Sequence, residues 1–203
     1  MVLYTTVYFV RHGATADFEA ERLQGQHRDD GLSRLGKAQI GWLAKGIAGL
    51  NITAIYSSDL VRATETAQIL GQARGLVPCL ESRLRELDFG EWEGATLPEL
   101  RERYPQEAIE PYVVPYAVER YGGESITALI ARTSAAWNAI TQEYRGQNVL
   151  IVSHAHALSA LIYTALDLPI GPVWRLGCDP GSLSTLLVRE NGTAVLHRLN
   201  HTF

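Results

Sequence analysis

The feature that most constrains the fold is an apolar run that ends in charged and polar residues, VYFVRHG at positions 7–13. Its β-branched and aromatic residues are typical of a buried strand, which would deliver Arg11 and His12 to its carboxyl end. Gly13 has no Cβ and would let the backbone turn tightly there. Because ligands of open α/β sheets bind beyond the carboxyl ends of the strands, this stretch predicts a functional site around His12.

A second apolar run, NVLIVS at 148–153, also delivers a histidine, His154, to its carboxyl end. Amphipathic spacing and capping residues predict helices between and after the two runs. The expected helices cover 35–50, 60–74 (capped by Asp59), 97–104, 125–144 and 156–166, with strands at 2–10, 54–56, 182–188 and 193–199. This alternation predicts an α/β fold in which helices cover both faces of a mostly parallel sheet.

The length of 203 residues suits a single domain, 1–203. Residues 14–31 are polar and rich in glycine, which predicts a functional loop folded over the site. Residues 106–122 contain Pro111, Pro115 and three tyrosines, so they cannot form one regular helix. We interpret residues 95–122, approximately, as a cap-like insertion beside the site.

Composition excludes several classes of protein. The net charge of −4 gives no global attraction to nucleic acid or to an anionic membrane. No apolar run is long enough to span a bilayer, and the first ten residues lack the basic region of a signal peptide. The two cysteines, Cys79 and Cys178, lie far apart and outside any C-x-x-C pattern, which favours reduced thiols in a cytoplasmic protein.

The strand ends bring together residue types that suit a phosphate group. Arg11 and Arg62 can each donate two hydrogen bonds to phosphate oxygens, and His154 can add a further donor. Arg62 lies in the first turn of a predicted helix, where a cation opposes the helix dipole, so helix stability alone does not explain it. These cations would neutralise the phosphoryl charge without a metal ion, and no cofactor is expected.

Within this set, His12 can attack phosphorus with one ring nitrogen while a backbone carbonyl holds the other. A carboxylic acid must then protonate the leaving oxygen, and we select Glu86 for this role. The competing carboxylates of the same segment are Asp88, Glu91 and Glu93, which could instead form a solvated face. The pair His154 and His156 lacks carboxylates at metal-ligand spacing, so we expect no metal site there.

Ordered motifs along nearly the whole chain support this interpretation. They are Arg11-His12-Gly13-x-Thr15, Gln24-Gly25, Leu32-Ser33-x-x-Gly36, Ile55-Tyr56-Ser57-Ser58-Asp59-Leu60-x-Arg62-Ala63-x-x-Thr66-Ala67, Leu84-x-Glu86-x-x-x-Gly90-x-Trp92-Glu93-Gly94, Gly123-Glu124-Ser125 and Val152-Ser153-His154. In this order the motifs resemble the histidine phosphatase superfamily, in its phosphoglycerate-mutase-like branch. The resemblance implies a three-layer α/β/α sandwich with a small cap over the site.

The resemblance also implies roles for individual residues. His12 would be the phosphorylated nucleophile, and Glu86 the proton donor. The phosphate site would comprise Arg11, Thr15, Gln24, Gly25, Arg62, His154 and Ala155. The chain departs from the family at Ala14, Asp17 and Phe18, where Phe18 replaces an asparagine that commonly helps to hold phosphate, so we expect a more apolar wall.

The activity implied is metal-independent hydrolysis of a small phosphorylated metabolite with release of inorganic phosphate. The chain lacks the Gly-Leu-Asn-Lys segment of cofactor-dependent mutases and resembles broad-specificity, α-ribazole and phosphoserine phosphatases instead. A phosphoglycerate mutase, and a non-catalytic module that binds a phosphorylated ligand, remain as alternatives. The sequence does not name the substrate, and it leaves a homodimer open because the apolar C-terminal hairpin could serve as an edge.

Overall fold

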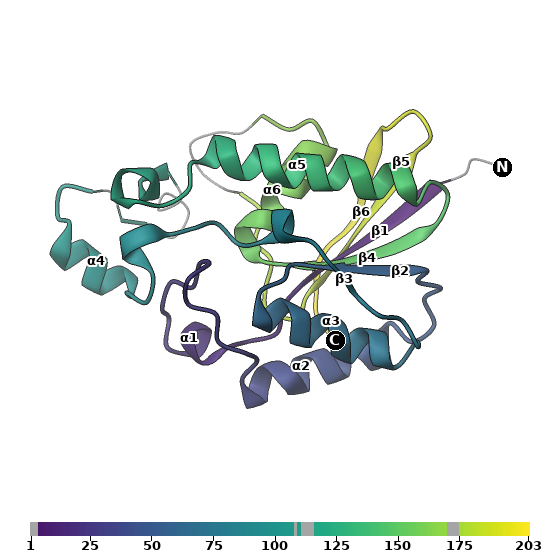
Figure 1. Ribbon diagram of the computed structural model, residues 1–203, viewed down its shortest axis with the longest axis horizontal. Coiled ribbons are helices and arrows are strands. Elements are labelled where there is room, and N and C mark those ends of the chain that lie inside the picture. The colour runs from purple at the N-terminus through teal and green to yellow at the C-terminus, as the bar shows by residue number, and fades with distance from the viewer. Residues whose placement is uncertain (1–3, 108, 111–115, 170–174) are drawn as a thin grey trace.

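A computed structural model describes residues 4–107, 109–110, 116–169 and 175–203. Its centre is a six-stranded sheet in the order β3-β2-β4-β1-β5-β6 (Figure 1). The strands are β1 (Tyr4–Arg11), β2 (Ala54–Ser57), β3 (Cys79–Leu80), β4 (Asn148–Ser153), β5 (Leu183–Arg189) and β6 (Ala194–His201). The ladders from β3 to β1 are parallel and those of β5 and β6 are antiparallel, which confirms the predicted mostly parallel sheet.

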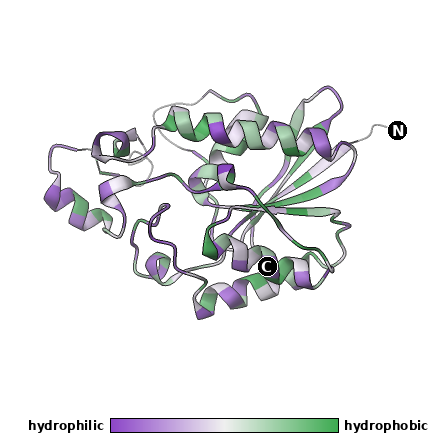
Figure 2. Cartoon of the chain, in the orientation of Figure 1, coloured by the Kyte–Doolittle hydropathy of each residue, from purple (hydrophilic) through white to green (hydrophobic). Residues whose placement is uncertain are grey.

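Helices cover both faces of this sheet, so the three-layer sandwich is also confirmed (Figure 1). α5 (Ile126–Glu143) and α6 (Ala155–Ala165) lie on one face, and α2 (Arg34–Gly46) and α3 (Val61–Gln72) lie on the other. Residues of β1 serve both cores, since Phe9 packs with α5 and α6 and Val10 packs with α2 and α3. Apolar residues line the strands between the helix layers, as burial on both faces requires (Figure 2).

The register of the central strands builds the site. β1 and β4 run in parallel with Arg11 opposite Ser153, so their carboxyl ends coincide. His12 and His154 each follow one of these paired residues, and their ring centroids lie 5.0 Å apart. Two histidines that are 142 positions apart (154 − 12) in the chain therefore become neighbours through the pairing of two strands.

A smaller group of elements packs beyond the ends of α5 and α6 (Figure 1). The short helix η1 (Ser82–Leu84) lies against α5 and shares its core, whereas this group consists of η2 (Gly90–Trp92), α4 (Leu97–Arg103) and η4 (Val118–Tyr121). Trp92 is fully buried there and stacks on Tyr121 with ring centroids 4.8 Å apart. This group includes most of the predicted cap, whose Pro111, Tyr112 and Pro115 lie outside the described residues. Its function as a cap stays a prediction.

Three local expectations are wrong in detail. Residues 14–31 are not wholly a loop, because they contain the short helix α1 (Ala16–Glu19), capped by the Thr15 hydroxyl. Asp59 does not cap α3, because its carboxylate pairs with Arg85; Asp29 accepts the Val61 N–H there instead. A glycine at position 13 is required by a close approach rather than by a special turn, since a Cβ would lie 2.6 Å from the carbonyl oxygen of Gly36.

Among the described residues, no helix is both long and apolar enough to cross a membrane.

Candidate active site

His12 is buried at the carboxyl end of β1, and its hydrogen bonds define its tautomer. Its Nδ1 lies 2.8 Å from the carbonyl oxygen of Gly13, which can only accept, so Nδ1 carries the proton. Its Nε2 accepts from Nε of Arg62 at 3.3 Å. Burial, reinforced by the charges of Arg62 and Arg11, holds the pKa of His12 well below its usual range. The imidazole is therefore neutral, with the lone pair of Nε2 directed toward the cations.

Arg62 lies in the first turn of α3, and its side chain is fully buried. Its Nη2 donates to the carbonyl oxygen of Gly25 at 2.7 Å, and its Nη1 lies 3.4 Å from both the carbonyl oxygen of Arg28 and Oδ1 of Asp29. The guanidinium is thus held by backbone oxygens of the segment at 25–29, while its Nε–H points at His12. This arrangement keeps a cation beside the imidazole, with an ion pair between Nη1 and the Asp29 carboxylate.

Arg11 reaches the same region from β1. Its Nη1 donates to the carbonyl oxygen of Cys178 at 2.7 Å, and its guanidinium carbon lies 5.2 Å from the centroid of the Phe18 ring. Phe18, the departure from the family pattern, therefore supports Arg11 through a cation–π contact. The ring that we expected to form a more apolar wall of the site thus packs against the guanidinium group of Arg11.

Several buried polar atoms of the predicted site residues have no hydrogen-bond partner among the described residues. They include Nε of Arg11, Nε2 of Gln24 and Nδ1 of His154. The Thr15 hydroxyl donates to Oε1 of Gln24 at 2.8 Å, which fixes the orientation of the Gln24 amide. Nε2 of His154 lies 2.9 Å from Oγ of Ser58. Because buried polar groups are normally paired, these atoms indicate a site for an acceptor-rich ligand such as phosphate.

Glu86 is buried at the N-terminus of α6. Its Oε1 accepts the N–H groups of Leu87, His156 and Ala157 at 2.9–3.2 Å, and Nδ1 of His156 lies 3.4 Å from Oε2. Burial raises the pKa of Glu86, but the charge and hydrogen bond of His156, the Leu87 N–H and the charge of Arg11 outweigh it and lower the pKa to about 2. In this arrangement Glu86 is an ionised carboxylate.

The other predicted residues have distinct positions. The carbonyl oxygen of Gly25 accepts a hydrogen bond from Nη2 of Arg62, and Ala155 is the first residue of α6. Of the competing carboxylates, Asp88 accepts from the Gly90 N–H, Glu91 is exposed and Glu93 accepts backbone N–H groups of residues 26–28. His156 contacts Glu86, whereas His154 contacts Ser58, so the pair is divided between two partners.

Comparison with known proteins agrees with this geometry. A model of the histidine phosphatase superfamily, branch 1, matches residues 7–202. The chain belongs to the histidine phosphatase superfamily. Within it, phosphoserine phosphatase 1 of Hydrogenobacter thermophilus is 32% identical over 193 residues, covering 95% of this chain and 90% of that protein. A probable phosphoglycerate mutase of Yersinia pestis is 36% identical over 185 residues, covering 91% of this chain and 86% of that one.

A solved structure extends the comparison to the fold. The mycobacterial glucosyl-3-phosphoglycerate phosphatase superimposes with a TM-score of 0.85 at 28% identity, covering 98% of this chain and 100% of that chain. Membership of the histidine phosphatase superfamily confirms the family drawn from the motifs. Sequence reasoning missed several residues that position the site, namely Asp29, Ser58 and the carbonyl groups of Arg28 and Cys178. Of these, only Ser58 lies in one of the sequence motifs. The other contacts are made by backbone atoms or by loop residues, which the motifs do not identify.

Proposed function

We propose that this protein is a phosphomonoesterase that acts through a phosphohistidine at His12. One observation carries the proposal. A neutral, buried imidazole with an unprotonated Nε2 that accepts from the buried Arg62 lies near the half-buried Arg11, and donor atoms around it have no partner among the described residues. Neutral histidine is nucleophilic, whereas the cations and free donors favour a phosphoryl group, which supplies only acceptors.

In the first step, the lone pair of His12 Nε2 forms a bond to phosphorus while the bond from phosphorus to the ester oxygen breaks. The leaving oxygen takes a proton from Glu86, and Nδ1–H of His12 stays on the carbonyl oxygen of Gly13. In the second step, water attacks phosphorus and gives its proton to Glu86. The N–P bond breaks, its electron pair returns to Nε2, and inorganic phosphate leaves.

Glu86 must acquire a proton before it can act as an acid. With a pKa of about 2 in the absence of substrate, it is ionised at neutral pH. A phosphoryl dianion beside it would raise this pKa, because like charges disfavour ionisation. A phosphate monoester itself titrates near pH 6, so a monoanionic ester can deliver the required proton when it binds. The acid therefore becomes competent only in the complex with substrate.

The substrate proposed is a small phosphorylated metabolite with one phosphate on a neutral or apolar body. The cap sequence contains more acidic than basic residues, and Arg120 is already paired with Glu107 at 2.7 Å. Two similar proteins have names that specify phosphoserine and glucosyl-3-phosphoglycerate as substrates, both monoesters. We further propose that hydrolysis needs no metal ion. A cytoplasmic location and a homodimer stay predictions.

A phosphoglycerate mutase is the second candidate, since a protein 36% identical to this chain has that name. A mutase returns the phosphoryl group of His12 to a second hydroxyl group instead of to water. The two functions differ in one assay, in which 3-phosphoglycerate is incubated with the bisphosphate cofactor. Exchange to 2-phosphoglycerate that is faster than phosphate release would favour the mutase. Tight phosphate binding without turnover of any ester would favour a non-catalytic binding module.

The proposal is tested with ³²P-labelled phosphomonoesters and rapid quenching in alkaline detergent. We expect an alkali-stable, acid-labile label on the wild-type protein and none on His12→Ala, which should remain folded by circular dichroism. A screen of phosphomonoesters in the presence of a chelator should reveal the substrate with activity intact. Turnover of p-nitrophenyl phosphate by His12→Ala would exclude His12 as the nucleophile. Marked loss of activity with the chelator would contradict metal independence.

A further inference from the structure

Glu93 binds the backbone of the segment at 25–29 with an unusual number of hydrogen bonds. Its Oε1 accepts the N–H of Gln26 at 2.7 Å, and its Oε2 accepts those of His27 and Arg28, both at 2.9 Å. Successive N–H groups directed at one point form a concavity that binds an anion. Here the anion is a side chain of the protein, so the carboxylate fixes the conformation of the loop.

A second, independent observation concerns Gly25. A Cβ built on this residue would lie 2.1 Å from Oε1 of Glu93 and 2.7 Å from its carboxyl carbon. The φ angle of Gly25 is not positive, so backbone conformation does not require glycine at this position. The residue must be small because the Glu93 carboxylate lies directly against it.

The peptide unit between Gly25 and Gln26 connects this carboxylate to the phosphate site. Its N–H donates to Glu93, and its carbonyl oxygen accepts from Nη2 of Arg62 at 2.7 Å. Because a trans peptide is planar and its N–H and C=O point in opposite directions, fixing one end fixes the other. A rotation that breaks the contact with Glu93 would also withdraw the acceptor from Arg62.

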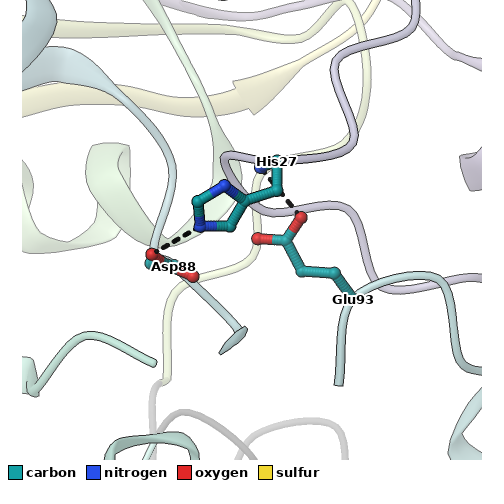
Figure 3. A group of neighbouring side chains, drawn as sticks. All are labelled: His27, Asp88 and Glu93. Carbon is teal, nitrogen blue, oxygen red and sulfur yellow. Dashed lines mark hydrogen bonds and ion pairs between the residues drawn. The ribbon is translucent and has the colours of Figure 1, made fainter. Parts of the chain in front are cut away.

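Neighbouring contacts hold the same segment. Nε2 of His27 lies 3.2 Å from Oδ2 of Asp88. Figure 3 marks this contact with a dashed line and shows Glu93 beside it. A ligand atom from each of His27, Asp88 and Glu93 lies within 4.8 Å of the others. The Glu93 oxygens already accept three backbone N–H groups and His27 Nε2 already contacts Asp88, so these side chains act as clamps on the loop. The Gln26 amide also donates to the carbonyl oxygen of Glu86 at 3.0 Å.

We propose that Glu93 is a positioning residue for phosphate binding, which acts on Arg62 through the peptide between Gly25 and Gln26. The inference rests on the proposed phosphate site, and it assigns a role to a carboxylate that does not itself face the imidazole. Without Glu93, the loop would lose the anion that orders its N–H groups, and Arg62 would lose its shortest acceptor. Affinity for phosphate should fall, whatever the alcohol of the ester.

The test is a double-mutant cycle read by calorimetric titration with inorganic phosphate, alongside KM and kcat for p-nitrophenyl phosphate. Glu93→Gln replaces one acceptor oxygen with an NH₂ group, which opposes the backbone N–H groups. We expect it to raise Kd for phosphate and KM about tenfold, the effect expected for losing a hydrogen bond to a charged group. Glu91→Gln is the matched control, because Glu91 is exposed two residues away, and it should change neither constant.

The mechanism is decided by coupling to Arg62. In an Arg62→Lys background, which removes Nη2, Glu93→Gln should weaken phosphate binding less than twofold. An equal loss in both backgrounds, or no loss in the wild-type background, overturns the positioning role. If Glu93→Gln does not fold, Gly25→Ala, which displaces the carboxylate sterically, is measured in the same cycle with the same criteria. Calorimetry does not need turnover, so a protein that binds phosphate without hydrolysing esters contradicts the phosphatase proposal alone.

Discussion

Arg62 and Glu86 are two buried charges of opposite sign on two sides of one site, and the backbone stabilises them in opposite ways. Arg62 donates to the carbonyl oxygens of Gly25 and Arg28, whereas Glu86 accepts N–H groups at the start of α6. On the side of Arg62, donors of Arg11 and Gln24 still have no partner among the described residues. On the side of Glu86, the carboxylate accepts several donors.

Under the proposed mechanism, this difference separates binding from proton transfer. Unpaired donors favour the arrival of an anion, so we expect the Arg62 side to supply affinity for phosphate. A carboxylate that accepts several N–H groups is stabilised in its ionised form, so the Glu86 side resists protonation until negative charge arrives. The two sides are then coupled by the substrate itself, because the phosphate that binds the cations also raises the pKa of the acid. Changes on the two sides should therefore have different kinetic signatures.

The largest difference is expected for Glu86→Gln, which cannot donate a proton to an alkoxide. We expect kcat for an alkyl phosphate such as glycerol phosphate to fall by about 10²–10⁴-fold, the usual contribution of a general acid. Because p-nitrophenolate leaves without a proton, the first step with p-nitrophenyl phosphate, measured as the burst of p-nitrophenol, should slow less than about tenfold in this variant. Rapid-quench assays of the first turnover with both esters measure this ratio, with Glu91→Gln as the control. Equal losses for the two esters would show that Glu86 is not the acid.

The opposite signature is expected for Arg62→Lys. Lysine keeps the charge but cannot direct Nε–H at His12 while Nη2 holds the Gly25 carbonyl oxygen. We expect KM to rise about 10–100-fold for both esters, as for loss of a charge-assisted hydrogen bond of about 1.5–3 kcal/mol. Steady-state kinetics with the same two esters measures this. A loss that depends on the leaving group would contradict the division between the two sides.

The two sides should also change the free energy of unfolding of the free protein in different pH ranges. Burial lowers the pKa values of His12 and His154 well below 6.5, so below that pH the unfolded chain binds protons that the folded chain does not. The free energy of unfolding should fall as pH falls below 6.5, by up to about 1.4 kcal/mol per pH unit for each histidine. The contribution of Glu86, whose pKa is lowered from 4.5 to about 2, is lost only as pH falls below about 4.5.

Urea unfolding at several pH values between 6.5 and 5 measures this slope where the histidines dominate. His154→Asn should remove about half of the slope attributable to the two histidines. His197→Gln, at an exposed position on β6, is the control for loss of a histidine outside the site. Stability that is constant over this range would mean that the two imidazoles accept protons in the folded state.

The two sides also differ in how far the sequence predicts them. His12 and His154 follow apolar runs, and parallel pairing of β1 and β4 is enough to bring them together. These local patterns also predict the main helices and strands to within a few residues. Glu86 could be selected as the acid only from its place in a motif, because it is one of four carboxylates in a segment without a periodic pattern. The acceptors of Arg62 are backbone oxygens in a loop, and side-chain identity does not encode their direction.

The same reason explains the errors. Asp59 has the residue type and position of a helix cap, but Arg85, 26 positions away, pairs with its carboxylate. Asp29, from a distant loop, takes the N–H of Val61 instead. The local rule was overridden by a tertiary ion pair and a tertiary hydrogen bond, neither of which the spacing of residues reveals. The sequence therefore predicted the strand-end histidines better than it predicted the loop contacts around Arg62.

The smallest effect concerns Phe18, where the binding side departs from the family pattern. Its ring lies 5.2 Å from the guanidinium carbon of Arg11, and a partly exposed cation–π contact contributes about 0.5–1 kcal/mol. Phe18→Leu should therefore raise KM about 2–5-fold for both esters and leave kcat unchanged, while Phe18→Tyr, which keeps the aromatic face, should match the wild type. Steady-state kinetics distinguishes the two variants. If leucine and tyrosine behave alike, the ring supports Arg11 by packing alone, and the binding side relies on its polar donors.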